Sequence, residues 1–171
     1  MFISYQYRDS RHWIPDVKFS PDGKSFAVAS MDHKIYIYNG ETYRLKGTCD
    51  RHNSHIREVN YSQDSMYIQS DSADNEHLYF EAEDGEFFSA GSQLKDIKWA
   101  DWTCIYGWPV QGAWPYFDDV EHGRAFEPTS AHRSPDHKLL SVGDQAGTVK
   151  LYNFPCLLKE VGTSVLVSLL L

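Results

Sequence analysis

The stretch "DVKFSPDGKSFAVASMDHKIYIYN", residues 16–39, decides the fold, because it contains three short runs of β-branched and aromatic residues. The runs cover residues 16–20, 25–30 and 34–38 and are separated by Pro-Asp-Gly and Met-Asp-His. Such residues are enriched in strands, and Pro21 and Gly23 suit the φ angles of a tight turn. The stretch is therefore predicted to form short antiparallel strands joined by tight turns.

The same pattern returns twice further along the chain. The second copy is "VNYSQDSMYIQSDSADNEHLYFE", residues 59–81, and the third is "RSPDHKLLSVGDQAGTVKLYN", residues 133–153. The first two copies match at four pairs, three with an offset of 42 residues and the last with an offset of 43: Val17 with Val59, Ser20 with Ser62, Asp22 with Asp64, and Tyr36 with Tyr79. A period of about 40–45 residues with four strands per unit is typical of propeller blades, and this pattern resembles the WD-repeat family.

Three copies predict an all-β fold: a WD-repeat β-propeller fragment of about three four-stranded antiparallel blades, not closed by itself. Closed propellers have about four to eight blades, so the rest of a parent propeller is an expected partner. We expect the blades at residues 10–49, 50–104 and 117–171, with an inserted aromatic crossover at residues 105–116. Unpaired strand edges predict poor solubility for such a fragment on its own.

Five polar residues of the repeats are expected to stabilise the blades. They are His52, Asp32, Asp22, Asp64 and Asp136. The resemblance to WD repeats implies that His52 stands for the His of the family's Gly-His pair. It also implies that Asp32 stands for a turn Asp that bonds to this His and to backbone groups. Asn75 and Ala146 replace that Asp in the second and third copies, so only partial networks are expected.

The sequence does not predict catalysis. Its His, Asp and Ser residues recur at the repeat spacing, which is typical of scaffold residues, and no Ser lies on a Gly-x-Ser-x-Gly turn. His52 and His55 are three residues apart, but no Cys or third His lies at the spacing of metal ligands. Neither a phosphate-binding Gly loop nor a dinucleotide fingerprint occurs. We therefore expect no catalytic, cofactor-binding or metal-binding residues and no cofactor.

Composition narrows the partners and the compartment. The 171 residues include 16 basic and 24 acidic ones, and the formal net charge of −8 disfavours nucleic acid and anionic membranes as partners. The most apolar stretch, "SVLVSLLL" at residues 164–171, is much shorter than the about 20 residues that cross a bilayer. Cys49, Cys104 and Cys156 are odd in number and far apart, so we expect no disulfide framework and a cytosolic location.

The interval between the second and third copies is unusually long. Asp64 and Asp136 are 72 residues apart, about 30 more than the repeat period requires. The interval contains "LKDIKWADWTCIYGWPVQGAWP", residues 94–115, which alternates as far as residue 106 and is expected to supply an outer strand. Pro109 and Pro115 exclude a central strand in the part that follows.

Two interpretations of the aromatic residues in this interval are open. In the first, four buried tryptophans seal a gap between blades or between two propellers: Trp99, Trp102, Trp108 and Trp114. In the second, four residues stay partly exposed as a partner-binding patch: Trp108, Trp114, Tyr116 and Phe117. Aromatic residues on a rigid loop suit such a patch because they lose little entropy on binding.

Four segments make the chain similar to the echinoderm microtubule-associated protein-like (EMAP-like) family. They are residues 13–39, 55–85, 99–115 and 133–156, and the third is the most specific because generic WD repeats lack it. The resemblance implies a non-enzymatic, cytoplasmic protein of the microtubule cytoskeleton that binds tubulin or microtubules and modifies microtubule assembly dynamics. The alternative is a general WD-repeat scaffold that binds other proteins and has no direct contact with tubulin.

Charge alone does not predict tubulin binding. Tubulin is acidic, and a chain with a net charge of −8 is not steered toward it. Either a local basic cluster such as Arg8, Arg11 and Lys18 makes the contact, or propeller loops recognise tubulin by shape, or attachment resides in other parts of a parent protein. We favour the last for attachment to the microtubule lattice.

Overall fold

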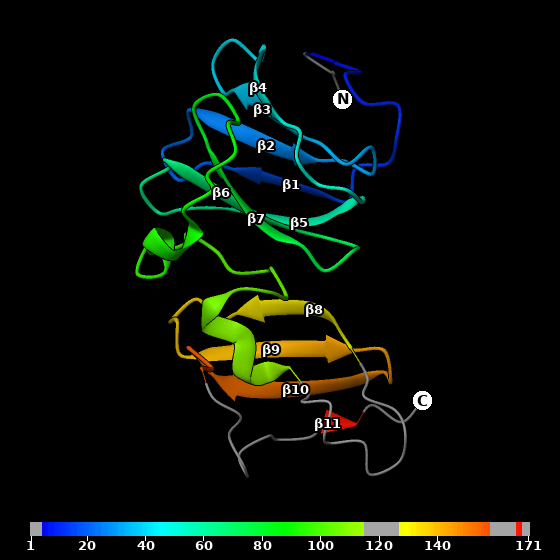
Figure 1. Ribbon diagram of the computed structural model, residues 1–171, viewed down its shortest axis with the longest axis vertical. Coiled ribbons are helices and arrows are strands. Elements are labelled where there is room, and N and C mark those ends of the chain that lie inside the picture. Colours follow the sequence, from blue (N-terminus) through cyan, green and yellow to red (C-terminus); the bar gives the residue numbers. More distant parts are fainter. Residues whose placement is uncertain (1–4, 115–126, 158–166, 169–171) are drawn as a thin grey trace. The chain divides into compact units, whose positions relative to one another are not determined.

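The computed structural model describes residues 5–114, 127–157 and 167–168 of the chain. Regular structure in these residues is almost entirely β-strand, with two short 3-10 helices. The strands form three separate antiparallel sheets and, within the described residues, no closed barrel (Figure 1). The chain divides into two compact units, Met1–Asp101 with the first two sheets and Trp102–Leu171 with the third. The predicted all-β propeller fragment of about three blades is confirmed.

The first sheet contains the three predicted strands and a fourth. The strands are β1 (Asp16–Phe19), β2 (Ser25–Ala29), β3 (Ile35–Asn39) and β4 (Leu45–Cys49), in the spatial order β1-β2-β3-β4 (Figure 1). Neighbouring strands are antiparallel, so Phe26 pairs with Phe19 on one side and with Tyr38 on the other. Successive side chains of a strand point to opposite sides, and the sheet therefore has two distinct faces.

The second sheet has three strands where four were expected. They are β5 (Ile56–Tyr61), β6 (Tyr67–Ser72) and β7 (His77–Glu81), each antiparallel to the next. On the outer side of β7, the described part of the chain forms an isolated bridge, between Phe80 and Phe87, and no further strand. Two further backbone bonds support this bridge, including one from the Phe88 amide to the Tyr79 carbonyl at 2.8 Å. A single bridge thus takes the place of a full outer strand.

The prediction of an outer strand from residue 94 to residue 106 is wrong. The 3-10 helix η1 (Gly91–Leu94) ends where that strand was expected to begin, and Trp99 then forms an isolated bridge with Ser62, just after β5. Trp99 is buried and stacks on Tyr79, with ring centroids 5.9 Å apart. The alternation of apolar residues therefore reflects an aromatic side chain packed on the sheet and not a strand at its edge.

The third sheet belongs to the second unit. Its strands are β8 (Pro128–Arg133), β9 (Leu139–Asp144), β10 (Thr148–Asn153) and β11 (Val167–Ser168), in the order β11-β10-β9-β8. The sequence of β8 is mostly polar and begins with Pro, so it carries no clear strand pattern. A bulge between Pro128 and Ser130 accommodates the residue without an amide hydrogen. The same unit contains the 3-10 helix η2 (Trp108–Ala113).

The three sheets repeat with constant offsets. The second and third strands of each sheet start their pairing at equivalent residues: Ser25 opposite Asn39, Tyr67 opposite Glu81, and Leu139 opposite Asn153. The offset from the first sheet is therefore 42 residues for the second and 114 for the third. The turns obey the same offsets, because Gly23, Ser65 and His137 have positive φ angles of 72°, 65° and 60°.

This register corrects two matches made from the sequence. Tyr36 is equivalent to Leu78 and not to Tyr79, and Asp32 is equivalent to Asp74 and not to Asn75. Both matches paired residues of similar chemistry with an offset of 43, which requires a gap that the strands do not have. The match of Asp32 with Ala146 agrees with the offset of 114.

The core of the first unit lies between its two sheets. The first sheet contributes Ala27, Ala29, Ile35, Ile37 and Cys49, and the second contributes Ile56, Val59, Tyr61, Ile68 and Phe80. Polar contacts reinforce this interface: the Val59 amide donates to the Asp16 carboxylate at 3.1 Å, and the Ser25 and Tyr61 hydroxyls are 3.2 Å apart. Burial of each large aliphatic side chain contributes about 1.5–3 kcal/mol. The apolar interface therefore dominates the packing of one sheet on the other.

The three cysteines are free and buried. Burial raises the pKa of the Cys49 thiol far above its usual value, so this thiol stays protonated and unreactive. Among the described residues, no helix is both long enough and apolar enough to cross a bilayer.

Candidate functional site

A serine and an aspartate close the first hairpin of every sheet in the same way. In each turn the Ser hydroxyl donates to the Asp carboxylate at 2.6 Å, in the pairs Ser20–Asp22, Ser62–Asp64 and Ser134–Asp136. The carboxylate also accepts from the backbone amide two residues further on. The Ser oxygen accepts from the amide five residues further on. All three aspartates thus make local contacts that satisfy the backbone of a turn.

In two of the three turns, these hydrogen bonds favour the ionised form of the carboxylate. The Ser20 hydroxyl and the Lys24 amide hold the pKa of Asp22 below its ordinary value. The Ser134 hydroxyl and the Lys138 amide have the same effect on the pKa of Asp136. Charge-assisted hydrogen bonds therefore stabilise each of these turns, and the bonded residues lie within a span of six residues.

His52 connects the segment before β5 to the second sheet. Its Nε2 lies 2.8 Å from Ser70 Oγ in β6, and its Nδ1 lies 3.3 Å from the Glu76 carboxylate, just before β7. Glu76 also accepts hydrogen bonds from the backbone and side-chain amides of Asn53. The imidazole lies 5.9 Å from the Phe80 ring, between centroids. The resemblance to WD repeats implied that a turn Asp bonds to this His, and in the second sheet Glu76 supplies that carboxylate.

Three hydrogen-bonded side chains have the order of an acid, a base and a nucleophile: Glu76, His52 and Ser70. Their burial, however, is typical of residues that stabilise a fold. Ser70 is 0% exposed and His52 is buried, so the hydroxyl is closed to a substrate. Burial lowers the pKa of His52, and the neighbouring Glu76 only partly opposes this shift. The ring is therefore neutral near pH 7, and its contacts join a loop to the interior of the sheet.

In the first sheet, Asp32 supplies the carboxylate of a similar hydrogen-bond network. Its carboxylate accepts a hydrogen bond from the Tyr36 hydroxyl at 2.8 Å. Burial alone would raise the pKa of Asp32, but hydrogen bonds from Tyr36, Ser10 and Ser30 outweigh it and hold the pKa below its ordinary value. With the offset of 42 residues, Ser10 is the equivalent of His52. A hydroxyl thus replaces the imidazole in this network.

The third sheet uses a residue that sequence reasoning missed. Ala146 has no carboxylate for the turn, and Asp144 instead accepts from the Ala146 and Thr148 amides and from the Thr148 hydroxyl. Lys150 Nζ lies 3.1 Å from the same carboxylate. Burial opposes ionisation of Asp144, but these bonds prevail and its pKa lies below the ordinary value. The sequence did not predict this network, because Asp144 lies two residues before Ala146, the position where the repeat pattern places the turn Asp.

Two tryptophans of the long interval are buried. Trp99 packs on Tyr79, as described above. Trp102 is 1% exposed, donates from Nε1 to the Cys104 carbonyl at 2.8 Å, and lies 6.0 Å from the Phe154 ring between centroids. The contacts of both side chains are those of packing residues.

Trp108 differs from them. It begins η2 and is 54% exposed, and Pro109 restricts the backbone φ angle directly after it. An aromatic side chain on such a rigid segment has the properties expected of a partner-binding residue. Tyr116 and Phe117, which the sequence grouped with it, lie outside the described residues.

The exposure of Trp114 is intermediate between that of the buried Trp99 and Trp102 and that of the exposed Trp108. Trp114 follows η2, is partly buried, and stacks on Tyr106 with ring centroids 4.6 Å apart. Its Nε1 donates to the Ile105 carbonyl at 2.7 Å. These contacts fold residues 105–114 back on themselves and hold the Trp114 ring in a fixed orientation.

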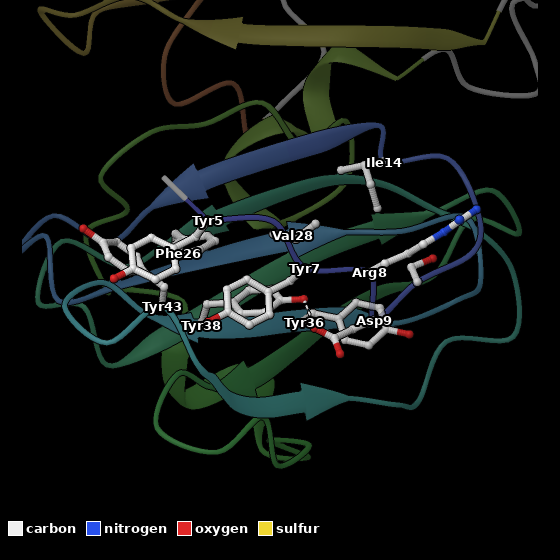
Figure 2. A pocket seen from close by; sticks show the side chains of 11 residues that line it. Tyr5, Tyr7, Arg8, Asp9, Ile14, Phe26, Val28, Tyr36, Tyr38 and Tyr43 are labelled. Carbon is white, nitrogen blue, oxygen red and sulfur yellow. Dashed lines mark hydrogen bonds between the residues drawn. The ribbon is translucent and has the colours of Figure 1, made fainter. Parts of the chain in front are cut away.

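A pocket of about 500 Å³ lies where residues 5–10 cross β2 and β3. Five tyrosines line it: Tyr5, Tyr7, Tyr36, Tyr38 and Tyr43. Figure 2 shows these rings gathered over the two strands, with Asp9 beside Tyr36. The sequence did not indicate this pocket, because its walls come from two segments that no local pattern relates.

Hydrogen bonds fix two of the tyrosines in the pocket. The Tyr38 hydroxyl donates to the Asp9 carboxylate at 2.6 Å. Burial and the hydrogen bond to Asp32 raise the pKa of Tyr36 to about 12, and burial and Asp9 raise that of Tyr38 still further. Both phenols therefore remain neutral hydrogen-bond donors at physiological pH.

The basic cluster suggested by the sequence is not a single charged patch. Arg8 lines the pocket just described. Lys18 lies on β1, with its Nζ 3.6 Å from Asp101 and 3.8 Å from Asp16. Two carboxylates thus compensate the Lys18 charge, which weakens it as a contact for an acidic partner.

Comparisons with known proteins agree with the repeat pattern. Residues 2–166 match a family described as the second β-propeller of echinoderm microtubule-associated proteins. The chain is 34% identical over 153 residues to the 77 kDa echinoderm microtubule-associated protein of Lytechinus variegatus, covering 87% of this chain and 22% of the relative. It is 34% identical over 154 residues to echinoderm microtubule-associated protein-like 1 of Homo sapiens, covering 88% of this chain and 18% of the relative.

Proposed function

This chain belongs to the echinoderm microtubule-associated protein family, and from that premise we propose that it acts in a non-enzymatic protein that binds tubulin or microtubules and modifies microtubule assembly. The observation that carries the proposal is the family match over residues 2–166. The chain spans about a fifth of the length of the curated relatives that it matches. We therefore assign the stronger part of the attachment to the microtubule lattice to other parts of a longer protein, and we assign to this chain a direct contact with tubulin that adds to it.

We place the contact with a protein partner at the exposed aromatic residue of η2. Trp108 is more than half exposed on a segment that Pro109 and the Trp114 contacts make rigid. Burying an indole contributes a large apolar area at little cost in side-chain entropy. Tyr116 and Phe117 complete the proposed patch by their position in the sequence.

The proposed mode of binding depends on shape more than on charge. The net charge of −8 gives no long-range attraction to an acidic partner, and two carboxylates flank Lys18. An apolar contact loses little affinity when salt is added, whereas attraction between opposite charges is screened. Binding to microtubules is therefore expected to persist as the salt concentration rises.

Co-sedimentation with microtubules tests the proposal. The full chain is mixed with taxol-stabilised microtubules at about 50–300 mM salt, a range over which the Debye length falls from about 14 Å to about 6 Å. We expect the chain in the pellet at every salt concentration and a weaker signal for Trp108→Ala. Trp13→Ala, at another exposed tryptophan, is the matched control and should pellet like the wild type. A chain that stays in the supernatant at all salt concentrations would contradict direct binding.

The second candidate function is a general WD-repeat scaffold that binds other proteins without touching tubulin. The observation in its favour is that an exposed tryptophan on a rigid segment suits many protein partners. The same experiment separates the two functions if it is repeated with a longer protein that contains this fragment. Failure of that protein to pellet supports the scaffold, and its appearance in the pellet supports microtubule binding.

Two further proposals follow from family membership. The expected location is the cytoplasm, on the microtubule cytoskeleton. The expected blades are residues 10–49, 50–104 and 117–171, each built around one of the three sheets.

A further inference from the structure

The sequence contains two Ser-Pro pairs and no Thr-Pro pair. The pairs are Ser20-Pro21 and Ser134-Pro135, which begin the first and the third of the Ser–Asp turns, with the offset of 114 residues between their sheets. Kinases of the proline-directed class transfer phosphate to a Ser or Thr that a Pro follows directly. The chain therefore offers such a kinase two candidate acceptors in equivalent turns.

The two acceptor hydroxyls differ in exposure. Ser20 is 3% exposed, and its hydrogen bond from the Ser25 amide is buried. Ser134 is partly exposed, and its bonds to the Asp136 carboxylate and from the Leu139 amide lie at the surface. All five residues that follow Ser134 are exposed as well. The hydroxyl of the third turn is therefore open to solvent, whereas that of the first turn is closed.

The first turn is also tied to the second sheet. The Asp22 amide donates to the Ser65 hydroxyl at 3.2 Å, and the Ser25 and Tyr61 hydroxyls are 3.2 Å apart. A kinase binds its acceptor segment in an extended form, so a turn must open before phosphate is transferred. Opening the first turn would break these contacts between sheets in addition to the hydrogen bonds of the turn itself.

The third turn opens at a smaller cost. Its backbone bonds run from the Ser134 amide to the Leu139 carbonyl and from the His137 amide to the Ser134 carbonyl, both at 2.9 Å. The first turn has the same two bonds. Of these two turns, only the first has further hydrogen bonds to a neighbouring sheet among the described residues. Local opening therefore requires less free energy at residues 134–139.

We propose that Ser134 is a phosphorylation site for a proline-directed protein kinase, and that the phosphate opens the turn between β8 and β9. In the transfer, Ser134 Oγ attacks the γ-phosphorus of ATP, so that a new O–P bond forms. The bond from this phosphorus to the bridging oxygen of ADP breaks, and the hydroxyl proton passes to a base of the kinase. The modified site lies in the third sheet, and its phosphorylation does not depend on microtubule binding.

A phosphate at Ser134 would disrupt the hydrogen bonds of the turn. The Ser134 hydroxyl donates to the Asp136 carboxylate at 2.6 Å, and phosphorylation removes this donor. It also adds a charge of about −1.5 to −2 beside a carboxylate that is itself ionised, because the pKa of Asp136 lies below its ordinary value. Lys138 Nζ, 3.9 Å from the Asp136 carboxylate, supplies one positive charge. Repulsion between phosphate and carboxylate is therefore expected to separate the two side chains and to loosen the hairpin.

The two prolines have a structural role as well. A Pro directly after the first residue of a turn has a φ angle that suits the turn, and this accounts for Pro21 and Pro135 equally. A purely structural role predicts no phosphate at either serine. The exposure of the Ser134 hydroxyl favours the additional role, and the buried Ser20 provides an internal control in the same chain.

The test exposes the full chain to an active mitogen-activated protein kinase with Mg²⁺ and ATP, and mass spectrometry of a protease digest locates the phosphate. We expect an initial rate at Ser134 at least about tenfold above that at Ser20, because the two turns differ in the free energy of local opening. Ser134→Ala and Pro135→Ala should each remove the signal, and Ser20→Ala should leave it unchanged. Synthetic peptides of residues 16–26 and 130–140 are the unfolded references and should react at similar rates.

Hydrogen exchange of the phosphorylated chain measures the effect on the turn. We expect at least about tenfold faster exchange at three amides that donate within the third turn, and no change at the equivalent amides of the first turn. These amides are those of Ser134, His137 and Leu139, and those of Ser20, Gly23 and Ser25. A sample that is incubated with the kinase but without ATP is the reference.

Three results would overturn the phosphorylation site: no phosphate at Ser134, equal rates at Ser134 and Ser20 in the full chain, or an undiminished signal from Pro135→Ala. Unchanged exchange at the amides of the third turn after phosphorylation would overturn the opening of the turn. Faster exchange in all three sheets alike would also contradict it, because the phosphate would then unfold the chain as a whole.

Discussion

Oγ of Ser70 lies 2.8 Å from Nε2 of His52, and both side chains are buried in the first unit. Ser70 is in the middle of β6, and His52 is in the segment that leads from β4 to β5. The contact therefore fixes the connection between two sheets to the interior of the second. Removing either partner leaves a buried polar group without its hydrogen bond.

His52→Ala should destabilise the chain by about 1–3 kcal/mol, because Ser70 and Glu76 lose a buried partner. Urea unfolding followed by tryptophan fluorescence measures the change. His12→Ala is the control, since His12 is exposed and its stability effect should be small. Equal stability of the His52 variant and the wild type would show that the network contributes nothing.

The same histidine predicts a pH dependence. Burial holds the pKa of His52 in the folded chain below the ordinary value of 6.5, so the unfolded chain binds the proton more readily. The stability contributed by neutral His52 is complete above that ordinary value and is lost as the pH falls through the folded pKa. The unfolding free energy of the wild type should therefore fall more steeply than that of His52→Gln from pH 7 to pH 5. Parallel pH profiles would contradict this account.

The repeated turns allow a comparison of the same hydrogen bonds at different depths. Ser62 is fully buried, whereas Ser134 is partly exposed, although both donate to an Asp at 2.6 Å. Ser62→Ala should cost about 1–3 kcal/mol and Ser134→Ala about 0.5–1.5 kcal/mol, because water can replace the exposed bond. Guanidinium unfolding of the two variants checks the order. A larger loss at Ser134 would be the opposite of what burial predicts.

Two tryptophans should respond differently to truncation. Trp102→Ala removes a buried side chain and should destabilise the chain by about 3–5 kcal/mol. Trp108→Ala should change the unfolding free energy by less than about 0.5 kcal/mol, because the side chain is largely exposed. Thermal unfolding by circular dichroism distinguishes the two effects. A large loss of stability in Trp108→Ala would favour the sealing interpretation over the partner-binding patch.

Alkaline pH tests the tyrosine-lined pocket. Burial and Asp32 raise the pKa of Tyr36 from 10.0 to about 12, so the folded chain holds this phenolic proton more tightly than the unfolded chain. The resulting stability is present below pH 10 and is lost as the pH rises toward 12. Tyr36→Phe removes this dependence, whereas Tyr43→Phe is the control at a more exposed ring. Ultraviolet absorbance of tyrosinate against pH follows the ionisation, and an unchanged titration in Tyr36→Phe would contradict the assignment.

The hairpins were predictable from the sequence because their causes are local. The alternation in residues 25–29 and the Pro21–Gly23 turn specify β2 and the turn before it without help from distant residues. The offset of 42 residues between the first two sheets was also predictable at β1, because Val17 and Val59 begin similar local patterns. It was missed at β3, where Tyr36 and Tyr79 share a side chain but not a position in the sheet.

The features that the sequence did not indicate depend on distant contacts. The pocket is formed by Tyr5 and Tyr7 lying over Tyr38 and Tyr43, which follow more than 30 residues later. Residues 94–106 alternate like a strand, but Trp99 takes its burial from Tyr79 on the second sheet. Periodicity records that one side of a segment is apolar, and it does not record which surface covers that side.

The Ser–Asp turns also have a consequence for how the chain reaches its fold. Each turn links residues two to five positions apart, as in Ser20 with Asp22 and with the Ser25 amide. Contacts this close in sequence carry a small loop-closure entropy and form rapidly. Folding can therefore start independently at three places, and the earliest hairpin can form on the ribosome before the last one has been synthesised.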